Sequence, residues 1–274
     1  MAPDVRKDER PSGRAFTQEA QHRYGPRVHL LDNPFLHALL ARIGAPESKG
    51  PEVADLIRVV YTAMLAEVAG RELPTATAHV PTRMFASTPR GVFRGTMLSR
   101  EASVVIACVI RAGMIPAQTC FELLSRVIDP ERVRIDVLAM ARVLDDKGRV
   151  TGVSLDGCKI GGSVEGSFLL VPDPMGATGG TVVKALAHYR ERYGAPRRVV
   201  AMPMIATPEY VKRVLDEVED SVIYAARLDR GLSSPDVLAT IPGERWAEER
   251  GLDEHQYIVP GAGGIGEVLN HSWA

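Results

Sequence analysis

The chain has 274 residues, a formal net charge of −1 and 45% hydrophobic residues, which predicts one large domain with its own core. The near-neutral charge gives no electrostatic reason to expect a nucleic-acid partner. No uncharged apolar run is long enough to span a membrane, and the polar N-terminus is not typical of a signal peptide, so we expect a cytoplasmic protein with no membrane partner.

Cysteine and histidine usage gives no sign of disulfides or of a zinc site. Cys108, Cys120 and Cys158 are odd in number and lack C-x-x-C spacing, and the seven histidines form no H-E-x-x-H-like cluster. Free thiols in a reducing compartment fit this pattern better than disulfide bridges. We therefore expect no metal held by protein ligands alone.

The N-terminal part changes character near residue 28. Residues 1–27 are charged and interrupted by proline and glycine, which predicts an arm that is flexible or held only by a partner subunit, in front of a single domain at residues 28–274. Inside that domain, Asn33 and Pro34 are typical of a helix start. Apolar side chains at helical spacing predict a second helix over residues 51–70.

The run from Ser103 to Ile110 is almost continuously apolar, which predicts a central parallel strand buried on both faces. Arg111 follows directly, at the end of the strand where open α/β sheets contact ligands; a solvated loop arginine is the alternative. A further strand is predicted within Val133–Leu144, ending near Arg142. The glycine-rich stretch behind it is a surface hairpin or, as the family resemblance given below implies, a flap.

A loop between a strand and a helix carries the strongest local signal. The apolar run Phe168–Val171 precedes it, and a helical pattern follows over residues 182–193. Free amides and the positive end of a helix dipole meet at such a junction, which makes an anion site. No Gly-Lys-Ser/Thr follows, so this is not a Walker loop. An ordinary tight turn is the alternative for a generic glycine-rich loop. The loop consists of Asp173, Pro174, Met175, Gly176, Ala177, Thr178, Gly179, Gly180 and Thr181.

Strands and helices continue to alternate toward the C-terminus. A strand is predicted over residues 197–205, a helix from Thr207 and Pro208, and another strand over Ser221–Ala226. This alternation predicts an α/β fold with a central, mostly parallel sheet flanked by helices.

The C-terminal residues Gly261–Gly266 fit a G-x-G-x-x-G pattern. A dinucleotide site needs a following helix, a second strand and an acid about twenty residues further on. Only residues 267–274 remain, so we exclude a nicotinamide or flavin enzyme on this pattern.

Three segments resemble the uracil phosphoribosyltransferases. Asp173-Pro-Met-x-Ala-Thr-Gly-Gly-Thr181 is similar to their 5-phosphoribosyl-1-pyrophosphate (PRPP) loop, Arg111-Ala-Gly113 to their pyrophosphate-facing loop, and Tyr257-Ile-Val-Pro-Gly261 to their base-binding segment. The resemblance implies a type I phosphoribosyltransferase fold, with a small hood formed by the N- and C-terminal segments. It implies phosphoribosyl transfer from PRPP to a pyrimidine base, foremost uracil, giving UMP and pyrophosphate in pyrimidine salvage.

The same resemblance implies roles for individual residues. Asp173, Arg111 and Arg142 match catalytic positions, and the two arginines join the whole loop from Asp173 to Thr181 in binding PRPP. Mg²⁺ is expected as a cofactor bound mainly through PRPP. Family members imply a homodimer or larger homo-oligomer, with GTP as an effector of some. The base-binding positions are Ile258, Gly263, Gly264 and Ile265.

This sequence departs from the family pattern near its C-terminus. The family's acid that contacts PRPP is Gly264 here, and Ile265 replaces a small residue beside the base. Two alternatives therefore stay open: a non-catalytic PRPP- or nucleotide-binding relative with a regulatory or subunit role, and a transferase that acts on a different base. Residues 232–251 resemble no family segment and are expected to be an insertion, either a lid, an interface element or a surface decoration.

Overall fold

The computed structural model describes residues 17–144, 146 and 150–271. No helix in this part of the chain is both long and apolar enough to cross a membrane. The helices are α1 (Pro34–Ile43), α2 (Gly50–Glu72), α3 (Met114–Leu124), α4 (Gly180–Arg192), α5 (Pro208–Glu217), α6 (Pro235–Leu238) and α7 (Ile265–Asn270), with short 3-10 turns η1 (Arg83–Ala86), η2 (Pro130–Arg132) and η3 (Trp246–Glu248). The strands are β1 (Val28–Leu30), β2 (Thr75–Pro81), β3 (Val92–Leu98), β4 (Val104–Ile110), β5 (Val133–Leu144), β6 (Val150–Lys159), β7 (Phe168–Val171), β8 (Met175–Gly176), β9 (Arg198–Ala201), β10 (Ile205–Ala206), β11 (Ser221–Ala225) and β12 (Arg227–Leu228).

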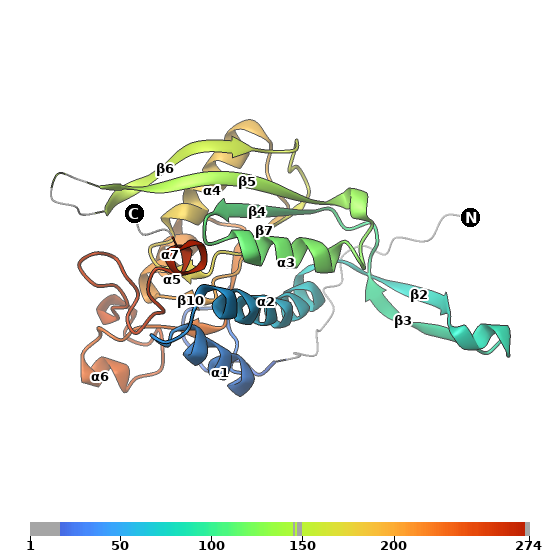
Figure 1. The fold of residues 1–274 in the computed structure, drawn as a ribbon, viewed down its shortest axis with the longest axis horizontal. Helices are drawn as coiled ribbons and strands as arrows, with labels where there is room; N and C mark the ends of the chain where they lie inside the picture. The colour runs from blue at the N-terminus through green and yellow to red at the C-terminus, as the bar shows by residue number, and fades with distance from the viewer. Residues whose placement is uncertain (1–16, 145, 147–149, 272–274) are drawn as a thin grey trace.

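A seven-stranded sheet in the order β1-β11-β9-β7-β4-β5-β6 forms the centre of the molecule (Figure 1). Every neighbouring pair is parallel except β5 and β6, which form an antiparallel pair at one edge. A small parallel sheet in the order β12-β10-β8 is formed by the short strands that follow β11, β9 and β7 of the large sheet along the chain. The predicted α/β fold with a mostly parallel central sheet is therefore confirmed.

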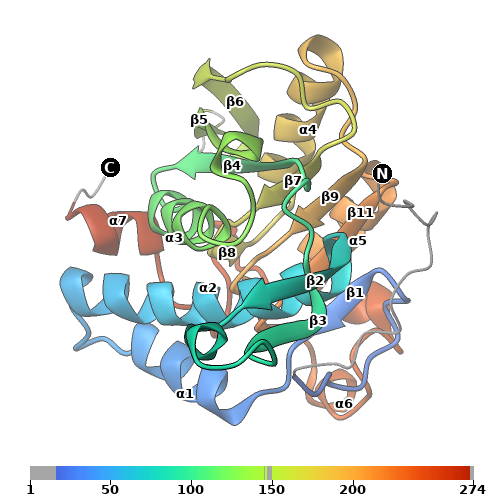
Figure 2. The same cartoon turned by 90° about the vertical axis from the view of Figure 1, so that its right-hand side faces the viewer.

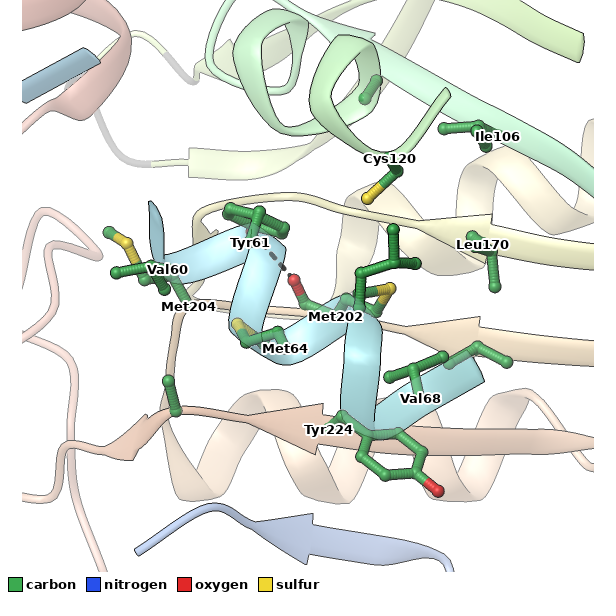
Figure 3. Close-up of a cluster of buried hydrophobic side chains, with 14 of the residues drawn as sticks. Val60, Tyr61, Met64, Val68, Ile106, Cys120, Leu170, Met202, Met204 and Tyr224 are labelled. Carbon is green, nitrogen blue, oxygen red and sulfur yellow. Dashed lines mark hydrogen bonds between the residues drawn. The ribbon is translucent and has the colours of Figure 1, made fainter. Parts of the chain in front are cut away.

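Helices cover both faces of the sheet because the strand side chains alternate between two cores. On one face Ile106 and Cys108 pack with residues of α1, α2 and α3. On the other face Val105 and Ala107 pack with residues of α4 and α5. Both faces of β4 are buried, which is why its sequence is a continuous apolar run rather than an alternating one. Figure 3 shows α2 lying across the first core, with Tyr61 bonded to Met202.

Two helix starts predicted from local sequence are confirmed. Asn33 caps α1 by accepting hydrogen bonds from the amides of Phe35 and Leu36. Thr207 caps α5 by accepting one from the amide of Tyr210 at 3.0 Å. Each cap satisfies helix amides that have no intrahelical partner.

The strand that carries Arg142 is longer than predicted. We expected it to end near that residue, but β5 continues to Leu144 because β6 pairs with it, and Arg142 lies opposite Val153 in this hairpin. Arg142 is thus inside a strand rather than after one, and the placement of its side chain lies outside the described part of the structure.

A second hairpin, β2–β3, projects from the body of the molecule (Figures 1 and 2). Most of its residues are exposed on both faces. Several large apolar side chains of the hairpin and of η1 between its strands are 41–58% exposed; they are Val80, Met84, Phe85, Phe93 and Met97.

The N- and C-terminal parts of the chain meet beside the sheet, as the expected hood requires. The helix α7 packs on α2, and Gly44 at the end of α1 lies against Gly261. Residues 1–16 of the predicted arm lie outside the described part of the chain. Residues 17–27 contact the domain: Thr17 donates its amide to Glu67, and Tyr24 is 4% exposed. The division at residue 27 stays a prediction.

Residues 232–251 fold against this N-terminal segment. Glu249 accepts a hydrogen bond from the Tyr24 hydroxyl and forms an ion pair with Arg230. The indole of Trp246 donates to the Pro208 carbonyl at the start of α5. Because none of these residues lines the large pocket described below, the packing favours a structural attachment over a lid.

Candidate active site

A pocket of about 840 Å³ lies at the carboxyl ends of β4 and β7, beside residues 139–141 of β5. Parallel strands end at the same edge of a sheet, so segments far apart in the sequence meet there. The pocket brings together most of the residues predicted from sequence. They are Arg111, Asp173, Met175, Ala177, Thr178, Gly179, Thr181, Ile258, Gly263, Gly264 and Ile265.

The loop from Asp173 to Thr181, here called the Asp173 loop, is held by the small sheet beneath it. Met175 and Gly176 form β8, which pairs with β10. The Thr207 hydroxyl donates to the Ala177 carbonyl at 2.6 Å, which ties the loop to the start of α5. Gly179 has φ of 75°, a left-handed conformation that glycine adopts without the steric cost of a side chain.

The Asp173 loop leads directly into the N-terminus of α4. This 13-residue helix begins at Gly180, and its N-cap residue, Gly179, supplies no side-chain cap. The Thr178 hydroxyl oxygen accepts a hydrogen bond from the Gly180 amide at 3.3 Å. Uncapped first-turn amides together with the helix dipole attract an anion, so this end of the pocket suits a phosphate group.

Pro174, Gly176 and Gly180 do not line the pocket, and the first two hold the Asp173 loop from behind. The Pro174 carbonyl accepts from Ile205, and the Gly176 carbonyl accepts from Thr207. These bonds fix the loop backbone to β10.

Arg111 follows β4 and supplies a cation to the pocket. The side chain is exposed, and the peptide bond joining Ile110 to Arg111 is cis. The turn that presents Arg111 closes at Gly113, where a Cβ atom would lie 2.5 Å from the Val109 carbonyl oxygen. Glycine is therefore required for this tight turn.

The C-terminal segment forms the opposite wall. Asp229 accepts a hydrogen bond from the Gly261 amide at 2.8 Å, and Arg227 donates to the Gly261 carbonyl at 2.9 Å. Arg227 and Asp229 are themselves an ion pair, and Asp229 is 2% exposed. This buried pair fixes the turn that places Ile258 and Ile265 in the pocket.

Several pocket residues were not found by sequence reasoning. Glu267 lines the pocket, and its carboxylate lies over Gly264, in space that a side chain there would need. The hairpin of β5 and β6 adds a further wall, which favours the flap interpretation of this segment. The sequence showed Glu267 only as an acid that follows the C-terminal glycines, and gave no sign that it lines the pocket. Other pocket residues outside the predicted set include Met140, Val153, Asp156, Tyr210 and His255.

No group of three or more histidine, cysteine, aspartate or glutamate side chains suited to hold a metal ion occurs within the described residues. The pocket nevertheless contains the carboxylates of Asp156, Asp173 and Glu267. Within the described residues these carboxylates do not gather into a group that could hold a metal by itself, so a Mg²⁺ ion here would take most of its ligands from substrate and water.

Comparison with known proteins agrees with the geometry. A family profile described as uracil phosphoribosyltransferase matches residues 30–244. The uracil phosphoribosyltransferase of Symbiobacterium thermophilum is 30% identical, over 89% of this chain and 97% of the relative. That of Shouchella clausii is 29% identical over 89% and 97%. The structure of the AQ2163 protein from Aquifex aeolicus is similar with a TM-score of 0.66 and 21% identity, covering 88% of this chain and 97% of that one, which shows a shared fold. The chain therefore belongs to the uracil phosphoribosyltransferase family.

Proposed function

We propose that the protein transfers a phosphoribosyl group from PRPP to uracil and releases UMP and pyrophosphate. The bond between C1′ and the pyrophosphate oxygen breaks, the bond between C1′ and a ring nitrogen forms, and that nitrogen loses its proton. Positive charge develops on the sugar in the transition state, as in other glycosyl transfers. The protein contributes positioning and charge neutralisation and needs no nucleophile of its own.

The Asp173 loop would hold the ribose 5-phosphate. The hydroxyl groups of Thr178 and Thr181 and the amides at the start of α4 are donors to the phosphate, and the Asp173 carboxylate accepts from the ribose hydroxyls. Arg111 would face the pyrophosphate, where its cation balances negative charge on the leaving group. Arg142 is proposed for the same role from its family match, since its side chain is not described.

The C-terminal wall would hold the base. Ile258 and Ile265 supply apolar contacts to a flat ring, and the backbone at Gly263 and Gly264 supplies donors and acceptors for its amide edge. The turn at Gly261 orients all four residues. Mg²⁺, bound mainly through PRPP oxygens, would supply charge neutralisation on the diphosphate.

One observation supports the proposal most strongly: the Asp173 loop and the C-terminal segment line the same pocket although more than seventy positions separate Thr181 from His255. A phosphorylated sugar and a flat base can therefore be held side by side. The test is to supply the full chain with PRPP, Mg²⁺ and a panel of bases, and to measure pyrophosphate and nucleotide. Uracil-dependent release of pyrophosphate by the wild type supports the proposal. The Asp173→Asn variant should lose most of this release.

The alternatives predict different results in the same assay. Binding of PRPP without pyrophosphate release would support the non-catalytic relative, and turnover with another base alone would support an altered acceptor. The pocket position of Glu267 weighs against loss of catalysis, because a carboxylate remains at this end of the pocket although residue 264 is glycine.

We further propose a homodimer or larger homo-oligomer that works in the cytoplasm. The β2–β3 hairpin supports this assembly: a lone two-stranded hairpin is marginally stable in water, and its apolar side chains are exposed. A second copy of the chain would cover them. GTP as an effector is proposed from the family alone.

A further inference from the structure

The hydroxyl of Tyr210 is buried and has no hydrogen-bond partner among the described residues. Tyr210 is 2% exposed and lines the large pocket. Native proteins rarely leave a buried hydroxyl unpaired, because the lost hydration is not replaced. A partner that the hydroxyl reaches only when a ligand binds would explain this arrangement.

Tyr61 provides a direct comparison. It too is fully buried, and it also lies within the electrostatic influence of Asp173. Its hydroxyl, however, donates to the Met202 carbonyl at 2.9 Å (Figure 3). Both tyrosines are buried and feel the charge of Asp173, although they pack in different cores, and they differ in whether the protein itself satisfies the hydroxyl.

The fold holds Tyr210 firmly beneath the Asp173 loop. Its amide donates to the Thr207 cap, and the same Thr207 hydroxyl donates to Ala177 in the loop. The Tyr210 ring packs so closely on Gly176 that a Cβ there would lie 3.2 Å from Cδ2. The ring has little freedom to turn away and find another partner.

Burial, and to a lesser degree the Asp173 charge, raises the pKa of Tyr210 well above its ordinary value. The hydroxyl therefore stays protonated at physiological pH and remains a donor. A donor close to a carboxylate stabilises the ionised form of that carboxylate.

We propose that Tyr210 is a positioning residue for Asp173: when the sugar binds, the Tyr210 hydroxyl donates to the Asp173 carboxylate, directly or through one water molecule. The bond holds the carboxylate in the orientation that accepts from the ribose hydroxyls. This inference rests on the proposed function, because the sugar is the ligand that completes the bond.

The test compares Tyr210→Phe with Tyr61→Phe. Without ligand, Tyr210→Phe should melt at or above the wild-type temperature, because it removes an unpaired hydroxyl, whereas Tyr61→Phe should melt lower, because it leaves the Met202 carbonyl unpaired. Calorimetric titration with PRPP and Mg²⁺ should show binding to Tyr210→Phe weakened by about tenfold, the effect of one hydrogen bond to a charged group.

A double-mutant cycle tests the route through Asp173. In an Asp173→Asn background, Tyr210→Phe should cost clearly less PRPP affinity than in the wild type, since coupled residues are non-additive. Three outcomes would each overturn the inference while the proposed function stands. Tyr210→Phe could bind PRPP as tightly as the wild type, or the losses of affinity in the cycle could be fully additive. Tyr210→Phe could also melt at a lowered temperature, as Tyr61→Phe is expected to do. Wild-type protein that does not bind PRPP would overturn both.

Discussion

The carboxylate of Glu267 occupies the space into which a side chain at position 264 would project, and a Cβ on Gly264 would lie 2.5 Å from the Glu267 Cδ. Glu267 is in the first turn of α7, and Gly264 is the residue before that helix. The glycine thus makes room for an acid that comes from three positions further along the chain.

This relationship predicts that one acid, at position 264 or at position 267, is enough for activity, and that acids at both positions together lower the activity. Glu267→Ala should lower kcat/KM for uracil by about tenfold, the value of one charged hydrogen bond. Gly264→Asp alone should also lower it, because two carboxylates would compete for one space and repel each other. The double variant Gly264→Asp with Glu267→Ala should recover activity above either single variant. A double variant less active than both single variants would contradict the idea that the two positions can exchange the acid.

Arg111 is predicted to act on the diphosphate end of PRPP. Arg111→Ala should lower kcat/KM by about 10²-fold or more, because a cation facing developing negative charge is lost. Arg111→Lys should retain only part of the wild-type kcat/KM, since an ammonium group cannot bind two oxygens in a planar fork. Steady-state kinetics with varied PRPP measure the effect. Arg58→Ala is the matched control, because Arg58 lies on the surface of α2 and pairs with Asp55. If Arg58→Ala lowered kcat/KM as much as Arg111→Ala, the role of Arg111 at the diphosphate would be contradicted.

The three thiols should differ sharply in reactivity. Burial raises the pKa of Cys108 to about 11 and that of Cys120 to about 12, whereas Cys158 is exposed. Raised pKa values suppress the thiolate, which is the reactive form, so at pH 8 Cys108 and Cys120 should stay unmodified. Mass spectrometry after iodoacetamide treatment of native protein should show one adduct, at Cys158, and three adducts after denaturation. Rapid native labelling of Cys120 would show that the α3 packing opens.

The β2–β3 hairpin is predicted to form an interface between copies of the chain. Phe93→Asp should shift the protein toward monomer in light scattering coupled to size exclusion, because it places a charge in an apolar contact. Phe35→Asp is the control: Phe35 is 60% exposed and belongs to α1 instead of the hairpin, so its replacement should leave the assembly unchanged. A monomeric wild-type protein would contradict the proposal outright.

Local sequence alone determined the elements whose causes are local. The apolar run of β4, the caps at Asn33 and Thr207, and the Asp173 loop all follow from neighbouring residues, and the structure confirms the strand, both caps and the alternating fold. The loop's short-range pattern also sufficed to name the family, because backbone amides, glycines and hydroxyls must be adjacent in the chain to cradle an anion.

Only the tertiary structure decided which distant residues meet. The extension of β5 past Arg142 depends on pairing with β6, the turn at Gly261 depends on Asp229, and Tyr210 reaches the pocket only because α5 is tied to the Asp173 loop. These contacts join residues that no periodicity or motif relates, since hydrogen bonds and close packing between remote segments form only once the sheet has brought them together. For that reason the sequence predicted the position of the Asp173 loop between a strand and a helix, while the acid beside Gly264 and the buried hydroxyl emerged from the fold.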